Sequence, residues 1–170
     1  LIEDTAGRLA AAGADVVDFE LPPSFDGILD LTWRVTHFEC ARCFAYDYAE
    51  HPETISGAVR DAVEAGRAVP YELYIEGLKT LESLRNEMHA VLDGFDAILT
   101  PSAVGEAPLG LSDTGPITFN YLWTVLHMPA ITLPLFTGPN GLPIGAQLVA
   151  RRHDDDRLLA IARWVERHVG

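Results

Sequence analysis

The sequence predicts an α/β fold in a single globular piece, with about four strands and five to six helices. Apolar residues recur at helical spacing in several segments, most regularly over residues 70–93. Short β-branched and aromatic runs, bounded by Pro or Gly, alternate with these helices. A length of 170 residues with 48% hydrophobic and 22% charged content suits one domain with an apolar core.

The first helix is expected over the opening residues, where Leu9 and its apolar neighbours recur at helical spacing. Gly13 follows where a left-handed C-terminal cap belongs. Residues 16–21 form a β-branched and aromatic run that ends at two prolines, which cannot continue a ladder. We therefore expect a helix followed by a strand.

An apolar stripe predicts one helix over residues 25–48, with Ser24 as its N-cap. Thr54 is expected to cap a shorter helix that Gly66 stops. Pro70 suits the first turn of the long helix that follows.

The run FDAILTP, residues 95–101, predicts a buried strand that Pro101 stops. Residues 102–116 are rich in Gly, Pro and Ser, and loops of that length inside compact domains are usually functional or disordered. A short helix is expected over residues 117–127, although its β-branched and aromatic residues leave a strand possible.

Residues 130–136 and 143–149 predict a β-hairpin, because Gly-Pro-Asn-Gly between them supplies turn chemistry. Pro134 places the first strand at a sheet edge or bends it there. The chain closes with a helix whose start carries three aspartates, where the dipole favours negative charge. Its predicted inward side chains are Leu158, Leu159, Ile161, Ala162 and Val165.

The run FNYLWTVLHMPAITLPLFTGPNGLPIGAQLVARRHDDDRLLAIARWVE, residues 119–166, resembles the C-terminal segment of the amidase signature family. FDAILTPSAVGEAP, AAGADVVDFELPP and VEAGRAVPYELYIEG resemble it further upstream. The resemblance implies a mixed β-sheet flanked by helices, of which residues 1–170 form the C-terminal portion. Because the chain does not begin with Met, we expect that something precedes Leu1.

Members of this family hydrolyse carboxamides, or transfer ammonia from them, with a nucleophilic serine, a second serine bridging through a cis peptide and a lysine base. The resemblance implies that all three lie upstream, so this segment is expected to be inactive alone and to have no catalytic residue, cofactor or metal. An alternative is a non-catalytic binding or assembly module of the same fold. The transamidase of tRNA-dependent amidation, represented by its A subunit, is a less favoured alternative.

The same resemblance makes five residues candidates for a substrate-binding wall: Pro101, Ser102, Thr118, Asn120 and Trp123. An alternative makes Trp123 a core residue and Asn120 a hydrogen-bonding group at a helix start. The close matches Gly141, Leu142, Pro143, Gly145 and Gln147 are expected to be structural. The glycines would let the turn and strand pass close to neighbouring backbone, and Gln147 would satisfy buried polar groups. His127 occupies a place where many family members carry glycine.

Two rival sites are weighed from the residues alone. Lys79 and Ser83 are spaced i, i+4, but an exposed helix face explains them better than a serine–lysine pair. His37, Cys40 and Cys43 offer soft metal ligands and a Cys-x-x-Cys pair, yet they fall in mid-helix and lack a fourth ligand.

The net charge of −13 disfavours nucleic acid and anionic membranes as partners. The opening residues lack the pattern of a signal peptide, so a cytoplasmic location is expected. The expected partners are a small amide substrate and the preceding part of the same protein. Unpaired strand edges and an apolar face also predict a homodimer, or a proteolytic remnant, for the isolated segment.

Overall fold

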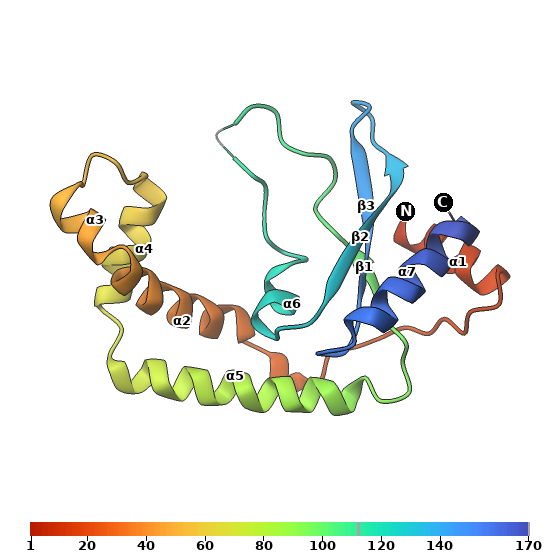
Figure 1. Cartoon of the computed structure of the whole chain (residues 1–170), viewed down its shortest axis with the longest axis horizontal. Helices are drawn as coiled ribbons and strands as arrows, with labels where there is room; N and C mark the ends of the chain where they lie inside the picture. The colour runs from red at the N-terminus through yellow and green to blue at the C-terminus, as the bar shows by residue number, and fades with distance from the viewer. Residues whose placement is uncertain (112, 170) are drawn as a thin grey trace. The chain divides into compact units, whose positions relative to one another are not determined.

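The computed structural model describes residues 1–111 and 113–169, so Ser112 and Gly170 lie outside the described residues. The chain divides into two compact units. We call Leu1–Pro22 with Arg85–Gly170 the sheet unit, and Pro23–Leu84 the helical unit. Figure 1 shows the elements along the chain. Across the described residues, no helix is both long enough and apolar enough to cross a bilayer.

The sheet unit contains a three-stranded antiparallel sheet of β1 (Ile98–Pro101), β2 (Ala130–Thr137) and β3 (Pro143–Val149) in the order β1-β3-β2. The predicted hairpin is confirmed as β2 and β3. Both expectations for Pro134 also hold, because β2 is an outer strand and its register shifts between Leu133 and Phe136. The β1 strand ends at Pro101, as predicted.

Helices α1 (Ile2–Ala11) and α7 (Asp155–Val169) pack beside the sheet and against each other (Figure 1). Their shared core consists of Leu9, Leu133, Leu148, Ala150, Leu158, Ala162, Val165 and Val169. Alternation along a strand places Leu133 and Leu148 on one sheet face, which faces this core. Leu159 was wrongly predicted to point inward: its exposed fraction is 57%, because it lies off the stripe that faces the sheet.

Short helix α6 (Tyr121–Val125) ends in a Schellman motif, in which a left-handed residue lets two N–H groups turn back to the helix carbonyls. His127 takes the left-handed position with φ 57°, and it donates its N–H to the carbonyl of Thr124. The N–H of Met128 reaches the carbonyl of Trp123 at 2.9 Å. A side chain thus occupies a left-handed position that favours glycine. Gly13, with φ 101°, ends α1 as predicted.

The helical unit holds a 3-10 turn, η1 (Pro23–Phe25), then α2 (Ile28–Cys43), α3 (Ala45–Glu50) and α4 (Gly57–Arg67). The single helix predicted over residues 25–48 is wrong. Its start moves to Ile28, because Gly27 is left-handed and replaces Ser24 as the N-cap. It is interrupted at Phe44, whose φ of −98° and ψ of 13° leave the helical region.

The predicted ends of the next helix are also wrong. Ser56 caps α4 in place of Thr54, because its side chain accepts from the N–H of Val59, whereas the Thr54 hydroxyl donates to the carbonyl of His51. Gly66 lies within the helix instead of stopping it. A Cβ on Gly66 would overlap the carbonyl of His37, so this glycine allows α4 to approach α2 closely.

The long helix is confirmed as α5 (Tyr71–Val91), which follows Pro70 and precedes the left-handed Gly94. The strand predicted over residues 16–21 is absent from the described structure. This segment is irregular, and its Val17 is 56% exposed. A strand needs a ladder partner, and residues 16–21 pair with none of the described strands. The described residues therefore form three strands and seven α-helices, against about four strands and five to six helices predicted.

Candidate functional site

The candidate site lies where β1 ends and the loop of residues 102–116 begins. Pro101, the last residue of β1, pairs with Ala146 of β3. Ser102 continues this pairing, since its N–H and its hydroxyl both donate to the carbonyl of Gly145, at 3.3 and 3.0 Å. The hydroxyl proton of Ser102 is thus held by a backbone carbonyl. A nucleophilic serine instead needs a basic partner for that proton, so this geometry does not suit Ser102 as a nucleophile.

Asn120 joins Ser102 from the start of α6. Its side-chain Nδ2 donates to the Ser102 carbonyl at 2.9 Å. Asn120 occupies the N-cap position of α6 and its side chain is hydrogen-bonded, as the alternative predicts, but the partner is the Ser102 carbonyl and not an N–H group of the helix. This hydrogen bond links the start of α6 to the residue that follows β1.

Gln147 holds the segment before α6 against the sheet. Its side chain is 4% exposed, and its Nε2 donates to the carbonyl of Phe119 at 3.1 Å. Strand alternation places Gln147 on the face opposite Leu148, away from the apolar core with α7. The expectation that Gln147 satisfies a buried polar group is confirmed, because an unpaired amide at this depth would be costly.

Gly145 lies at the centre of this face and allows three segments to meet. A Cβ at this position would overlap Cγ2 of Thr132 and would come within 2.6 Å of the Ser102 Oγ. It would also lie 3.4 Å from the carbonyl oxygen of Leu133. The close approach expected at this glycine is confirmed, and it keeps Ser102 within hydrogen-bonding range of β3.

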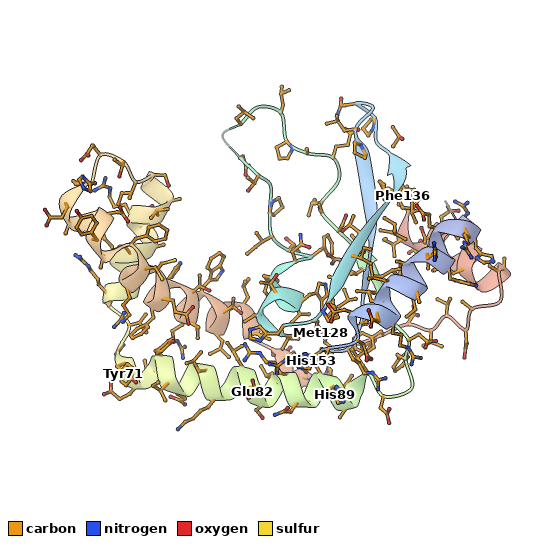
Figure 2. The ribbon with its side chains drawn as sticks, in the orientation of Figure 1. Tyr71, Glu82, His89, Met128, Phe136 and His153 are labelled. Atoms are coloured by element: carbon orange, nitrogen blue, oxygen red, sulfur yellow. The ribbon has the colours of Figure 1, made fainter. Side chains whose placement is uncertain are left out.

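A pocket of about 280 Å³ opens beside these groups. Pro101 and the loop residues Ala103, Val104 and Gly105 form one wall. The hairpin supplies Phe136, Ile144 and Gly145, and Phe136 is labelled on β2 in Figure 2. Leu1, Ile2 and Phe119 complete the lining. Every lining side chain is apolar, so the pocket suits an uncharged, apolar group.

The same loop is tied to the hairpin turn by a carboxylate. Glu106 accepts from the N–H and the Nδ2 of Asn140 at 3.0 and 2.6 Å, and from the N–H of Leu142 at 2.9 Å. Gly138 makes room for it, because a Cβ there would overlap the Glu106 carboxyl. We call Glu106 with Asn140 and Leu142 the Glu106 clasp.

Opposing effects act on the pKa of Glu106. Partial desolvation raises the pKa of this carboxyl, but the hydrogen bonds from Asn140 and Leu142 outweigh that effect and hold the pKa below its ordinary value. The clasp therefore favours the ionised carboxylate.

Of the five predicted site residues, the structure brings Pro101, Ser102 and Asn120 together. Trp123 is 7% exposed within α6, as the core alternative predicts, and Thr118 is exposed. Sequence reasoning missed Glu106. The loop holds two acidic residues, Glu106 and Asp113, and the signal available was an acid in a Gly- and Pro-rich loop together with an Asn-Gly turn further along the chain.

The rival residues lie in the helical unit. Lys79 and Ser83 are exposed on α5. Cys40 is half-buried and Cys43 exposed on α2, both as free thiols, and the His37 ring stacks on Trp33. Within the part of the chain that the structure describes, no group of three or more His, Cys, Asp or Glu side chains is arranged to hold a metal ion.

The fold and the site define an α/β protein whose sheet packs against helices on one face and carries hydroxyl and amide side chains on the other, with an apolar pocket at the end of β1. Comparison with known families extends this result. The Amidase family model matches residues 1–159, and the chain belongs to this family, the amidase signature family.

Curated relatives match different lengths of the chain. The A subunit of glutamyl-tRNA(Gln) amidotransferase from Pseudothermotoga lettingae is 38% identical over 108 residues, which cover 59% of this chain and 23% of that protein. The 2-amino-5-chloromuconic acid deaminase of Comamonas testosteroni is 27% identical over 182 residues, covering 99% of this chain and 39% of the relative.

Solved structures match the whole fold. A crystal structure of amidase superimposes with a TM-score of 0.86 at 30% identity, covering 99% of this chain and 41% of that one. The 6-aminohexanoate cyclic dimer hydrolase complexed with substrate shares the fold, with a TM-score of 0.77 at 20% identity. Where nearly the whole chain is matched, it spans about two fifths of the length of these proteins.

Proposed function

We propose that this chain is the C-terminal part of an amidohydrolase that cleaves a carboxylic acid amide to the acid and ammonia or an amine. The observation that carries the proposal is the family match over residues 1–159. The superposition on a solved amidase supports it, because the two folds agree over 99% of this chain. Residues 1–170 would form one piece with the preceding part of the protein.

The proposed chemistry is nucleophilic catalysis by a serine, a second serine and a lysine that lie outside this chain. The serine hydroxyl would attack the amide carbon while the base accepts its proton, and the amine would leave with a proton; water then hydrolyses the acyl-enzyme. Ser102 and Lys79 are poor substitutes, because the first donates to a carbonyl and the second is exposed on α5. We therefore expect the segment alone to be inactive.

This chain would contribute the wall of the substrate cleft. Pro101, Ser102 and Asn120 lie together beside the apolar pocket, and the carbonyl of Ser102 already accepts from Asn120. Such groups orient a bound amide without taking part in bond making.

The experiment that tests the proposal uses the whole protein and a panel of aliphatic, aromatic and peptide amides. We expect release of ammonia or amine from at least one class, and loss of that release when the serine of an upstream Gly/Ser-rich motif is changed to Ala. If the reading frame before Leu1 begins at once with a start codon, or if no amide is cleaved, the non-catalytic binding or assembly module is the better interpretation.

A second candidate is the transamidase of tRNA-dependent amidation. The observation that favours it is the 38% identity, over 108 residues, to the A subunit of glutamyl-tRNA(Gln) amidotransferase from Pseudothermotoga lettingae. This candidate predicts that ammonia is released from glutamine, and that the release rises when partner proteins and glutamylated tRNA are added. Hydrolysis of simple amides without any such dependence would favour the first candidate.

A further inference from the structure

The Glu106 clasp lies beside the apolar pocket and joins its two walls. Ala103, Val104 and Gly105 line the pocket and directly precede Glu106 in the loop. The opposite wall includes Phe136 and Ile144, which flank the hairpin turn that Glu106 holds. The loop wall therefore cannot move away from the hairpin unless the hydrogen bonds of Glu106 break.

The hairpin turn offers only donors to the group that fills this position. Two N–H groups and one amide Nδ2 from Asn140 and Leu142 converge on the Glu106 oxygens. A carboxylate accepts all three, whereas a glutamine would place an NH₂ group against N–H donors. The geometry thus favours an ionised carboxylate, whose two oxygens accept from all three donors, over a neutral amide of the same length.

We propose that Glu106 is a positioning residue that fixes the width of the apolar pocket and so selects amides that carry a small, compact apolar group. The pocket volume of about 280 Å³ is near the lower end of ligand pockets, which span about 300–1,000 Å³. A branched alkyl group or a single ring suits such a pocket better than a long chain. This selectivity rests on the proposed amide hydrolysis, whereas the positioning of the loop does not.

The clasp has a defined response to pH. The residues of the facing turn, 138–142, are Gly, Pro, Asn, Gly and Leu, none of which titrates. In its own loop, Asp113 accepts from the N–H of Gly115. Because the clasp lowers the pKa of Glu106, its stabilisation is complete above the ordinary carboxyl pKa and is lost as pH falls through the lowered value.

Hydrogen exchange measured by mass spectrometry on the whole protein tests the positioning. In Glu106→Gln we expect the protection of the Asn140 and Leu142 N–H groups, which donate to the carboxylate, to fall about tenfold at about pH 7, as befits the loss of a hydrogen bond to a charged group. Peptides from α7 report global stability and should be unchanged. Glu166→Gln, an exposed glutamate on α7, is the matched control and should leave these two N–H groups protected.

The pH dependence of hydrogen exchange distinguishes the Glu106 clasp from a general contribution of Glu106 to stability. Protection of the Asn140 and Leu142 N–H groups in the wild type, corrected for intrinsic exchange, should stay constant above the ordinary carboxyl pKa and fall as the pH drops below it, whereas Glu106→Gln should show the same low protection throughout. The proposal is overturned if these N–H groups are as protected in the variant as in the wild type, or if α7 loses protection equally.

Kinetics of the same variants test the selectivity. The wild type should prefer isobutyramide to decanamide, and Glu106→Gln should reduce that preference about fivefold through KM with little change in kcat. An unchanged preference overturns the selectivity. If the wild type hydrolyses no amide at all, the proposed function is wrong and the selectivity with it, and the exchange data alone decide whether Glu106 positions the loop.

Discussion

Gly145→Ala is the substitution for which the structure predicts the clearest loss of folding stability. Its new methyl group would overlap Cγ2 of Thr132 and lie 2.6 Å from the Ser102 Oγ. Both neighbours are held, one within β2 and the other by its bond to the Gly145 carbonyl, so the strands must separate or the side chains must rotate. Overpacking of this kind costs about 1–3 kcal/mol.

The cost is measurable as a change in Tm. About 2 kcal/mol in a protein of this size lowers Tm by roughly 4–8 °C, which thermal denaturation followed by circular dichroism resolves. Gly7→Ala is the matched control, because Gly7 lies inside α1 and the position of its new methyl group has no atom within 4 Å. That change should stabilise the protein by about 0.5–1 kcal/mol through helix propensity.

A third variant isolates the cause of the loss. Thr132→Ser removes the Cγ2 that the new methyl group would overlap, so Gly145→Ala should cost less in that background. If Gly145→Ala is as stable as the wild type, or if Thr132→Ser does not reduce its cost, close packing at Gly145 is not what holds this face together.

Three further predictions concern single side chains. Leu148→Ala should lower the free energy of unfolding by about 2–5 kcal/mol, measured by urea denaturation, because Leu148 is 3% exposed in the core with α7. His127→Val should cost about 1–2 kcal/mol, because a β-branched residue at φ 57° is strained, and His127→Gly should not reproduce that loss. Ser102→Ala should cost about 1 kcal/mol and leave measurable amidase activity in the whole protein; complete loss of turnover with normal folding would contradict its assignment as a wall residue.

The elements that the sequence predicted best are those whose signals are local. The hairpin was predictable because its turn residues and the position of Pro134 act within a few residues of each other. The long helix α5 was predictable because its apolar stripe runs unbroken between Pro70 and Gly94.

The errors arise where distant partners decide the outcome. Residues 16–21 have strand-like composition, but composition does not supply a neighbouring strand. The sequence pattern predicts that a helix ends at Gly66. Gly66 instead lies inside α4, where the carbonyl of His37 leaves no room for a side chain. Such contacts between helices are not visible in a local pattern.

The candidate site shows the same difference between features set by local sequence and features set by distant partners. Pro101 and Ser102 were predictable as the end of a strand that opens into a loop. The bond from Asn120 to the Ser102 carbonyl was not, since eighteen positions separate the two residues. Glu106 was missed for a related reason: its partners, Asn140 and Leu142, lie 34 and 36 positions further along the chain.

The order β1-β3-β2 limits how the described sheet can grow. The outer side of β2 is interrupted by Pro134, which has no N–H to donate, and by the irregular register beside it. The outer side of β1 has a regular backbone from Ile98 to Thr100. A strand that joins this sheet from another part of the protein therefore meets a regular hydrogen-bonding edge beside β1 and an interrupted edge beside β2.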